Sequence, residues 1–233
     1  MRPFRTTLCM LILLFVSGTA LAQQDVPRFE IGAQFSLFSL QRPSQIVGNG
    51  MDPCCDRVVP GTGHRNEPGV GVRFTYNLTA NLAFEAVGNL FPRKETTGAM
   101  PGGRIFQAQF GVKAGKRFRK FGVFGKARPG LVGFTEVTKL IGTFTIGPSG
   151  PLNQVFTVGR FGTGKDVYFS ADLGGVVEFY ASRRIVTRFD VGDTIIRYGT
   201  FHQAGYILSR AIIERPPETK HNLQFSAGVG FRF

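Results

Sequence analysis

Polar and apolar residues alternate with a period of two through most of the chain after residue 28. This alternation predicts β-strands with one apolar face and one polar face. Within the predicted strands, no position on the apolar face carries a charge. Asp193 continues the apolar phase of the seventh strand and Pro129 cannot donate to a ladder, so we expect both near a rim or a bulge. The eight predicted strands are 29–37, 70–78, 82–90, 106–114, 123–131, 167–179, 185–191 and 223–233.

The connectors between these strands alternate strictly in length. Three short connectors lie at 79–81, 116–120 and 181–184, and four long ones at 41–67, 92–103, 135–165 and 199–220. All the long loops therefore lie at one end, which is the layout of an all-β, eight-stranded antiparallel up-and-down transmembrane β-barrel. The alternative is a soluble calyx, whose apolar face would point inward around a ligand.

The long segment 135–165 has a strand-like pattern of its own on both sides of GPSGP and indicates a hairpin. It could extend the fifth and sixth strands beyond the membrane, or add two strands and make a ten-stranded barrel. We prefer the extension. No apolar run of about 18 residues follows the amino terminus, which excludes a membrane-spanning helix in the mature chain.

The amino terminus has the three parts of an export signal: two arginines in MRPFR, the apolar run LCMLILLFV, and a small-x-small site that ends at Ala22. We therefore expect residues 1–22 to be a cleaved signal peptide and residues 23–233 to form the barrel domain. The adjacent Cys54 and Cys55 could form only a strained disulfide, so a labile bridge and two free thiols both remain open. The 233-residue chain contains 31 glycines and 24 phenylalanines but no tryptophan, which favours packed β-structure over helix bundles.

The last predicted strand, LQFSAGVGFRF, has apolar residues at every second position back from Phe233. Together with the signal and the eight strands, it resembles the small outer-membrane β-barrel family of Gram-negative bacteria, including the transmembrane domain of outer membrane protein A. The resemblance implies a bacterial outer-membrane location and recognition of the last strand by the barrel-assembly machinery. No peptidoglycan-binding domain follows, so we expect no wall-anchoring role, and we expect a monomer. The residues of this expected assembly signal are Phe225, Val229, Phe231 and Phe233.

The polar face of the strands would place five cations and four anions inside a barrel just wide enough for its own side chains. Buried charges must pair or be hydrated. The set could form a proton or ion path or a polar plug, and the narrow lumen favours the plug. The nine candidate residues are Arg73, Glu85, Lys113, Lys126, Arg128, Asp172, Glu178, Arg188 and Asp190.

The formal net charge is +13. This basic excess, with Lys116, Arg117, Arg119 and Lys120 in one short connector, suggests binding to outer-membrane lipids and lipopolysaccharide. We expect no nucleic-acid binding, because the chain has no basic helix or aromatic stacking platform and is exported.

Some small barrels that modify lipid A use a histidine and a serine separated by one residue, plus a carboxylate. Here Leu223 occupies the position two after His221, Ser226 faces the other way, and His64 and His202 have no serine at that spacing. We therefore expect no enzyme, cofactor or metal site, but a barrel with a plugged interior that supports the envelope or presents its outer loops to a partner still unknown. The competing functions are a narrow passive channel, a lipid A-modifying enzyme and a soluble ligand-binding calyx.

Overall fold

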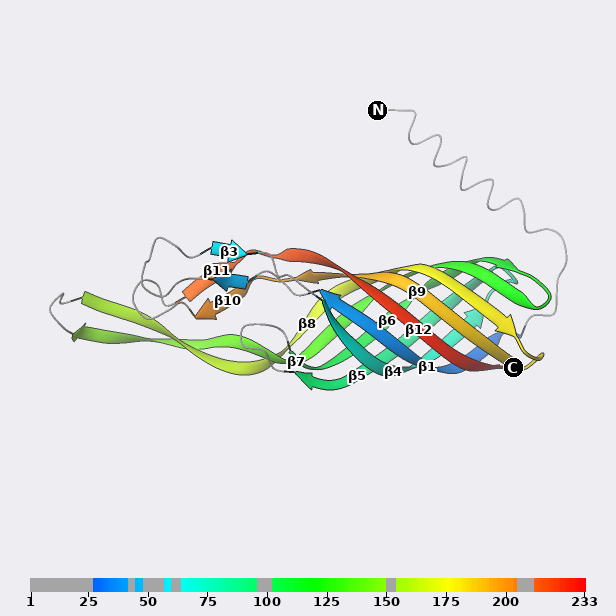
Figure 1. Cartoon of the computed structure of the whole chain (residues 1–233), viewed down its shortest axis with the longest axis horizontal. Helices are drawn as coiled ribbons and strands as arrows, with labels where there is room; N and C mark the ends of the chain where they lie inside the picture. The colour runs from blue at the N-terminus through cyan, green and yellow to red at the C-terminus, as the bar shows by residue number, and fades with distance from the viewer. Residues whose placement is uncertain are drawn as a thin grey trace, which may run out of the picture.

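The computed structural model describes residues 27–41, 45–47, 57–59, 64–95, 102–149, 154–204 and 212–233. The predicted signal, Cys54 and Cys55 lie outside these ranges. Eight antiparallel strands close a barrel in the order β1-β12-β9-β8-β7-β6-β5-β4 (Figure 1). No helix in the described part is long and apolar enough to cross a membrane. The barrel strands are β1 (Phe29–Gln41), β4 (His64–Asn77), β5 (Leu82–Glu95), β6 (Gly102–Arg117), β7 (Phe121–Ser149), β8 (Gln154–Tyr180), β9 (Ile185–Tyr198) and β12 (Glu218–Arg232).

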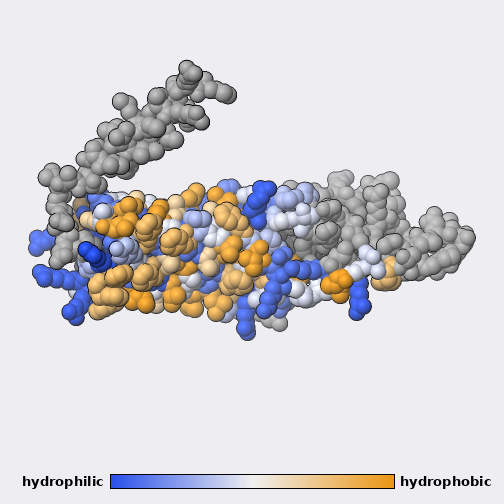
Figure 2. Space-filling view, turned by 180° about the vertical axis from the view of Figure 1, so that it is seen from behind, coloured by the Kyte–Doolittle hydropathy of each residue, from blue (hydrophilic) through white to orange (hydrophobic). Residues whose placement is uncertain are grey.

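The predicted apolar face lies on the outside of the barrel. Phe110, Phe35 and Val229 are all more than half exposed, whereas the residues beside them along each strand are mostly buried. Figure 2 shows apolar residues covering the wall and hydrophilic ones gathered at its end. On β12 the apolar positions run from Leu223 to Phe233, which corresponds to a band about 25 Å tall for a strand tilted by roughly 40°. This band matches a bilayer core, and the calyx alternative is wrong because the apolar face does not point inward.

The three short connectors are confirmed as tight turns at one end of the barrel, where residue 27 and Phe233 also lie (Figure 1). At the opposite end the strands run further than the sequence predicted. Strands β7 and β8 stay paired from Phe121↔Phe179 to Ser149↔Gln154, so the extension is correct and the barrel has eight strands. Two small hairpins accompany this end: β2 (Gln45–Val47) with β3 (Arg57–Val59), and β10 (Phe201–Ala204) with β11 (Ile212–Arg215).

Two details of the ladders differ from expectation. Pro129 lies in the interior of β7, with no register shift around it. Its missing N–H interrupts the backbone hydrogen bonds to β6 only. On the other side, Pro129 stays paired with Ala171 of β8. The register shifts lie instead toward the outer ends of the strands, in the ladders β5–β6, β6–β7 and β7–β8. At the shift in β6, Gly103 has a left-handed φ of 72°. A side chain at Gly103 would also lie 2.4 Å from the Thr135 hydroxyl, so this position requires glycine. Asp193 lies in a regular ladder, at the outer edge of the apolar band.

Candidate functional site

Eight charged side chains from five strands meet in the lumen and form what we call the central cluster. Each of the eight is at most 6% exposed. The four cations and four anions make the cluster neutral. Because each of these positions follows the inward phase of its strand, ordinary strand pleating brings the side chains together. The members are Glu85 of β5, Lys113 of β6, Lys126 and Arg128 of β7, Asp172 and Glu178 of β8, and Arg188 and Asp190 of β9.

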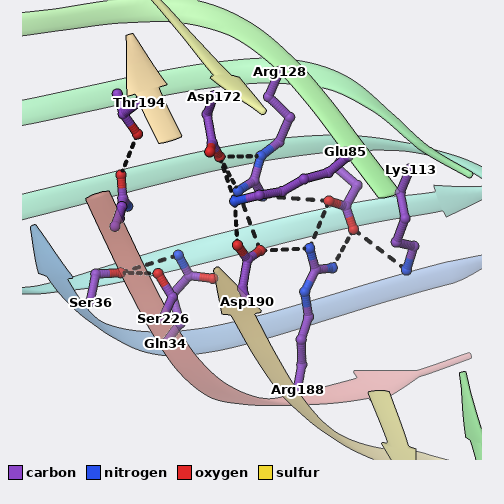
Figure 3. Close-up of polar contacts among 12 residues, drawn as sticks. Gln34, Ser36, Glu85, Lys113, Arg128, Asp172, Arg188, Asp190, Thr194 and Ser226 are labelled. Carbon is purple, nitrogen blue, oxygen red and sulfur yellow. Dashed lines mark hydrogen bonds and ion pairs between the residues drawn. The ribbon is translucent and has the colours of Figure 1, made fainter. Parts of the chain in front are cut away.

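Arg188 forms the main bridge across the barrel (Figure 3). Its Nη2 donates to Glu85 Oε2 at 2.9 Å and to Asp190 Oδ2 at 3.0 Å, and its Nη1 also donates to Glu85. Strands β9 and β5 are four places apart in the closed order of eight. The bidentate Arg188–Glu85 pair therefore joins opposite walls, which is the strong form of a charged hydrogen bond.

Lys113 links Glu85, the acidic end of this bridge, to Glu178 of β8. Its ammonium donates to Glu178 and lies 3.5 Å from Glu85 Oε1, above the Phe124 ring at 4.6 Å. Arg188 Nη1 lies 3.6 Å from Glu178 Oε1. Glu85 and Glu178 therefore share two cations.

Arg128, Lys126, Asp172 and Asp190 form the other half of the central cluster. Asp172 Oδ2 accepts from Arg128 Nη2 at 2.5 Å and from Lys126 Nζ at 2.7 Å. Lys126 also donates to Asp190, and Arg128 reaches Asp190 at 3.3 Å. Gly192 leaves the room for this arrangement, since a Cβ there would lie 2.2 Å from Asp172 Oδ1 and 2.8 Å from Lys126 Nζ.

The ninth predicted residue, Arg73, lies apart from the central cluster. Its Nη2 donates to Glu30 Oε1 at 2.9 Å, and Glu30 is fully buried. Glu30 lies on the polar face of the first predicted strand but is not among the nine candidate interior charges. The pairing of β1 with β4 explains the contact. Glu30 lies opposite Thr75, and Arg73 is two residues before Thr75 on the same face of β4. Arg117, assigned to a turn, also reaches inward, with Nη2 3.7 Å from Glu178 Oε2.

A layer of neutral polar side chains lies on the outer side of the central cluster. The amide of Gln107 donates to Gln224 Oε1 at 3.0 Å, which again joins opposite walls, β6 and β12. Gln34 donates to Asn89 Oδ1 at 2.9 Å. The hydroxyls of Ser36 and Ser226 are 2.8 Å apart (Figure 3). This second level is therefore bridged across the lumen as well.

An apolar layer follows at the outer end of the lumen. The rings of Phe38 and Phe91 are 5.4 Å apart, and those of Phe134 and Tyr198 are 6.3 Å apart. The sequence gives a signal for this layer, because both phases become apolar at Leu37–Phe38 and at Leu90–Phe91. The buried members are Phe38, Leu40, Phe91, Ile105, Val132, Phe134, Val137, Ile196 and Tyr198.

The four residues of the expected assembly signal all lie on the outside of β12. Phe225, Val229, Phe231 and Phe233 are between 45% and 60% exposed. Phe233 exchanges backbone hydrogen bonds with Phe29 at 3.0 and 3.1 Å, and their rings stack 6.0 Å apart. The last residue therefore closes the barrel between β12 and β1.

An exposed acid–base pair marks the outer edge of the apolar band. Asp193 Oδ2 lies 2.5 Å from His221 Nδ1, and Asp193 Oδ1 accepts the backbone N–H of Asn222 at 3.0 Å. Ser226 points inward to Ser36 and is not near this pair. In the described residues, no group of three His, Cys, Asp or Glu side chains could hold a metal ion.

No protein-family model matches the chain, and no curated protein matches it. Among solved structures, it is similar to outer membrane protein OprG from Pseudomonas aeruginosa, with a TM-score of 0.46, 11% identity, and coverage of 89% of this chain and 96% of that chain. Neisserial surface protein A gives a TM-score of 0.44 at 11% identity, over 88% and 97% of the two chains.

The outer membrane protein W of Escherichia coli is 18% identical, with a TM-score of 0.34 and coverage of 89% and 98%. At these values we transfer no residue role or ligand from any neighbour. The assignment instead depends on the closed eight-stranded barrel, the apolar outer wall and the buried polar lumen of this chain. The protein has the architecture of a small outer-membrane β-barrel.

Proposed function

We propose that this protein is a non-enzymatic outer-membrane barrel with a closed lumen, and that its function lies on its outer surface. The observation that carries the proposal is the pair of bridges between opposite walls, Arg188–Glu85 and Gln107–Gln224. An ion crossing the barrel would have to break both bridges and then pass the apolar layer. Apolar constrictions oppose ion passage by excluding water.

Charge balance supports a plug over an ion path. Every charged member of the central cluster lies within 4 Å of at least two side chains of opposite charge. Removing one partner would leave a buried charge, so movement of a single side chain is costly. A lumen filled in this way stabilises one arrangement of the wall.

The extended part of β7 and β8 is the most prominent surface for an outside partner (Figure 1). At 3.3 Å per residue, residues 137–149 of β7 correspond to a length of about 40 Å along the strand. Ile141 and Phe144 are more than half exposed. Residues 137–165 contain Lys139, Arg160 and Lys165. Lys139 lies 3.6 Å from Asp166 at the base of the ribbon, whereas Arg160 and Lys165 are exposed, so the ribbon suits an anionic partner with apolar groups.

Exposed cations at the outer edge of the apolar band suit the phosphates of lipopolysaccharide. Arg104, Lys165 and Arg197 are exposed on β6, β8 and β9. Because they continue the outward phase of their strands, they lie where the lipid headgroups would be. We therefore include lipopolysaccharide binding in the proposal. We also include insertion by the barrel-assembly machinery, because β12 has apolar residues at every second position.

A liposome-swelling assay tests the closed lumen. Purified protein in liposomes should allow no swelling in small sugars or salts beyond that of empty liposomes. Swelling in proportion to the amount of protein would contradict the proposal and favour a passive channel.

The Asp193–His221 pair is the specific observation that would favour a lipid-modifying enzyme, since a carboxylate beside a histidine can position a general base. Thr219 lies on the same outward face, two residues before His221. The proposal predicts that mass spectra of lipid A are identical in cells expressing the protein and in cells expressing His221→Ala. A lipid A species that disappears with His221→Ala would establish the enzyme instead.

A further inference from the structure

We propose that the turn end of the barrel binds an anionic phospholipid of the periplasmic leaflet, with the headgroup on two basic turns and an acyl chain in an adjoining groove of the outer wall. Short turns face the periplasm in barrels of this architecture. The site is separate from the central cluster and from the extended ribbon.

Five exposed cations make up what we call the basic turn patch. Lys116, Arg119 and Lys120 belong to the β6–β7 connection, and Arg183 and Arg184 to the β8–β9 connection. The two connections are neighbours, because the Tyr180 N–H donates to the Lys120 carbonyl at 2.9 Å. The charge is therefore gathered over β6 to β9 on one side of the barrel.

The basic turn patch has few acidic neighbours. Segments 76–84, 114–122 and 179–185 contain no acidic residue. Glu85 and Glu178, at their borders, are fully buried, and Glu178 points inward to Lys113. The third turn, Leu78–Asn81, carries no charge at all. Exposed Arg28 lies near this turn, but the positive charge is concentrated on the side of the basic turn patch, to which anionic groups would be attracted more strongly.

Aromatic rings set the depth of the basic turn patch in the bilayer. The rings of Phe118 and Phe121 stack at 4.6 Å, and the Lys116 ammonium lies 5.6 Å from the Phe118 centroid. Aromatic residues gather at the headgroup level of membrane barrels. The cations therefore lie at the level of lipid phosphates, where each contributes on the order of 1 kcal/mol toward an anionic surface.

An apolar groove of about 380 Å³ begins beneath the same turns. It lies between two rows of outward residues paired from strand to strand. The lower row is Val123↔Val177↔Phe189↔Ala227↔Phe35, across β7, β8, β9, β12 and β1, and the upper row is Gly175↔Val191↔Phe225↔Leu37. Val123 is two residues from the start of β7, whereas Phe35 is six residues from the start of β1. The groove therefore climbs from the turn end into the bilayer.

Small residues form the floor of the groove between phenylalanine walls. Gly175 and Ala227 lie among Phe35, Phe189 and Phe225. Four inter-strand spacings give a length of about 20 Å. With strands tilted by roughly 40°, the groove rises about 12 Å, which is most of the roughly 15 Å depth of one leaflet. A phospholipid with one acyl chain in the groove can therefore place its phosphate at the basic turn patch, so one molecule contacts both the apolar and the basic surface. Lipopolysaccharide fits less well, because the patch is at the end opposite to the outer-leaflet edge.

The test measures lipid retained by the full-length protein. Delipidated protein would be incubated with dioleoylphosphatidylglycerol or dioleoylphosphatidylcholine and analysed by native mass spectrometry. We expect the wild type to retain phosphatidylglycerol preferentially. The variant Arg119→Gln/Lys120→Gln/Arg183→Gln/Arg184→Gln should reduce that retention by about tenfold or more, given the size of each surface charge contribution.

Two matched controls separate the site from its general effects. Arg104→Gln/Arg160→Gln/Lys165→Gln/Arg197→Gln removes the same number of exposed cations at the other end. It should lower the retention of phosphatidylglycerol less than the turn variant does, because the groove begins at the turn end. Gly175→Phe should fill the groove and weaken retention, whereas Gly88→Phe should not. Both glycines face outward, and a Cβ at either has no neighbour closer than 3.9 Å, so both variants should fold, as checked by the gel shift on boiling.

Three results would overturn the proposal. They are equal retention of the two lipids by the wild type, equal loss in the two charge variants, and full retention of phosphatidylglycerol by the turn variant. Equal loss would mean that net charge alone attracts the lipid. Loss in Gly88→Phe as large as in Gly175→Phe would remove the groove from the site.

Discussion

Replacing Glu85 by glutamine should destabilise the barrel strongly, although the side chain keeps its size. Glu85 is fully buried and accepts two hydrogen bonds from Arg188, with Lys113 and Arg128 each 3.5 Å away. The variant would leave four cations and three anions in the central cluster. Breaking a buried ion pair on one side typically costs 3 to 5 kcal/mol. We expect about 3 kcal/mol, because Arg188 keeps Asp190 at 3.0 Å and Glu178 at 3.6 Å.

The assay is equilibrium urea unfolding of the protein folded into lipid vesicles. Asp193→Asn is the control, since it removes a carboxylate that contacts His221 on the outside of the barrel. It should change the unfolding free energy by at most about 1 kcal/mol. Glu85→Gln/Arg188→Met should recover part of the loss by restoring neutrality. A loss for Glu85→Gln no larger than for Asp193→Asn would refute the reasoning, because the cluster would then be hydrated.

Further predictions concern the wall, the packing of the cluster and assembly. Phe110→Arg, at a position 61% exposed, should cost about 2 to 4 kcal/mol in the same unfolding assay, whereas Phe110→Leu should cost little; equal costs would mean that this face does not meet lipid. Gly192→Ala should lower stability, because its methyl group would displace Asp172 from Lys126, and unchanged urea midpoints would count against the close packing. Phe233→Asp should reduce the amount of heat-modifiable protein in outer membranes, because it places a charge at the β1–β12 closure; normal amounts would argue against an assembly role.

The fold could be predicted from sequence where the membrane imposes the pattern. Within the apolar band, every outward residue must tolerate lipid, so alternation identified all eight strands and the three turns. Beyond the band this constraint ends. Strand β4 begins at His64 and not near residue 70, and β7 continues to Ser149, because polar residues outside the bilayer can occupy either face.

The site was less accessible to sequence reasoning, because phase gives the face of a residue but not its partner. The nine candidate charges are all in the interior, yet register decides that Arg73 meets Glu30 and that Arg188 crosses to Glu85. Glu30 shared the inward phase and could have been included on that ground. The apolar layer was missed because inward aromatic residues such as Phe38 and Phe91 break the simple rule of a polar interior.

Single-molecule conductance in a planar lipid bilayer tests the closed lumen most directly. The account predicts that the wild-type protein, inserted in folded form, shows no steady conductance. It also predicts that Gln107→Ala/Gln224→Ala stays closed, because the Arg188–Glu85 bridge and the apolar layer still block the lumen. A large and steady conductance in the wild type would contradict the account and make ion passage the leading function.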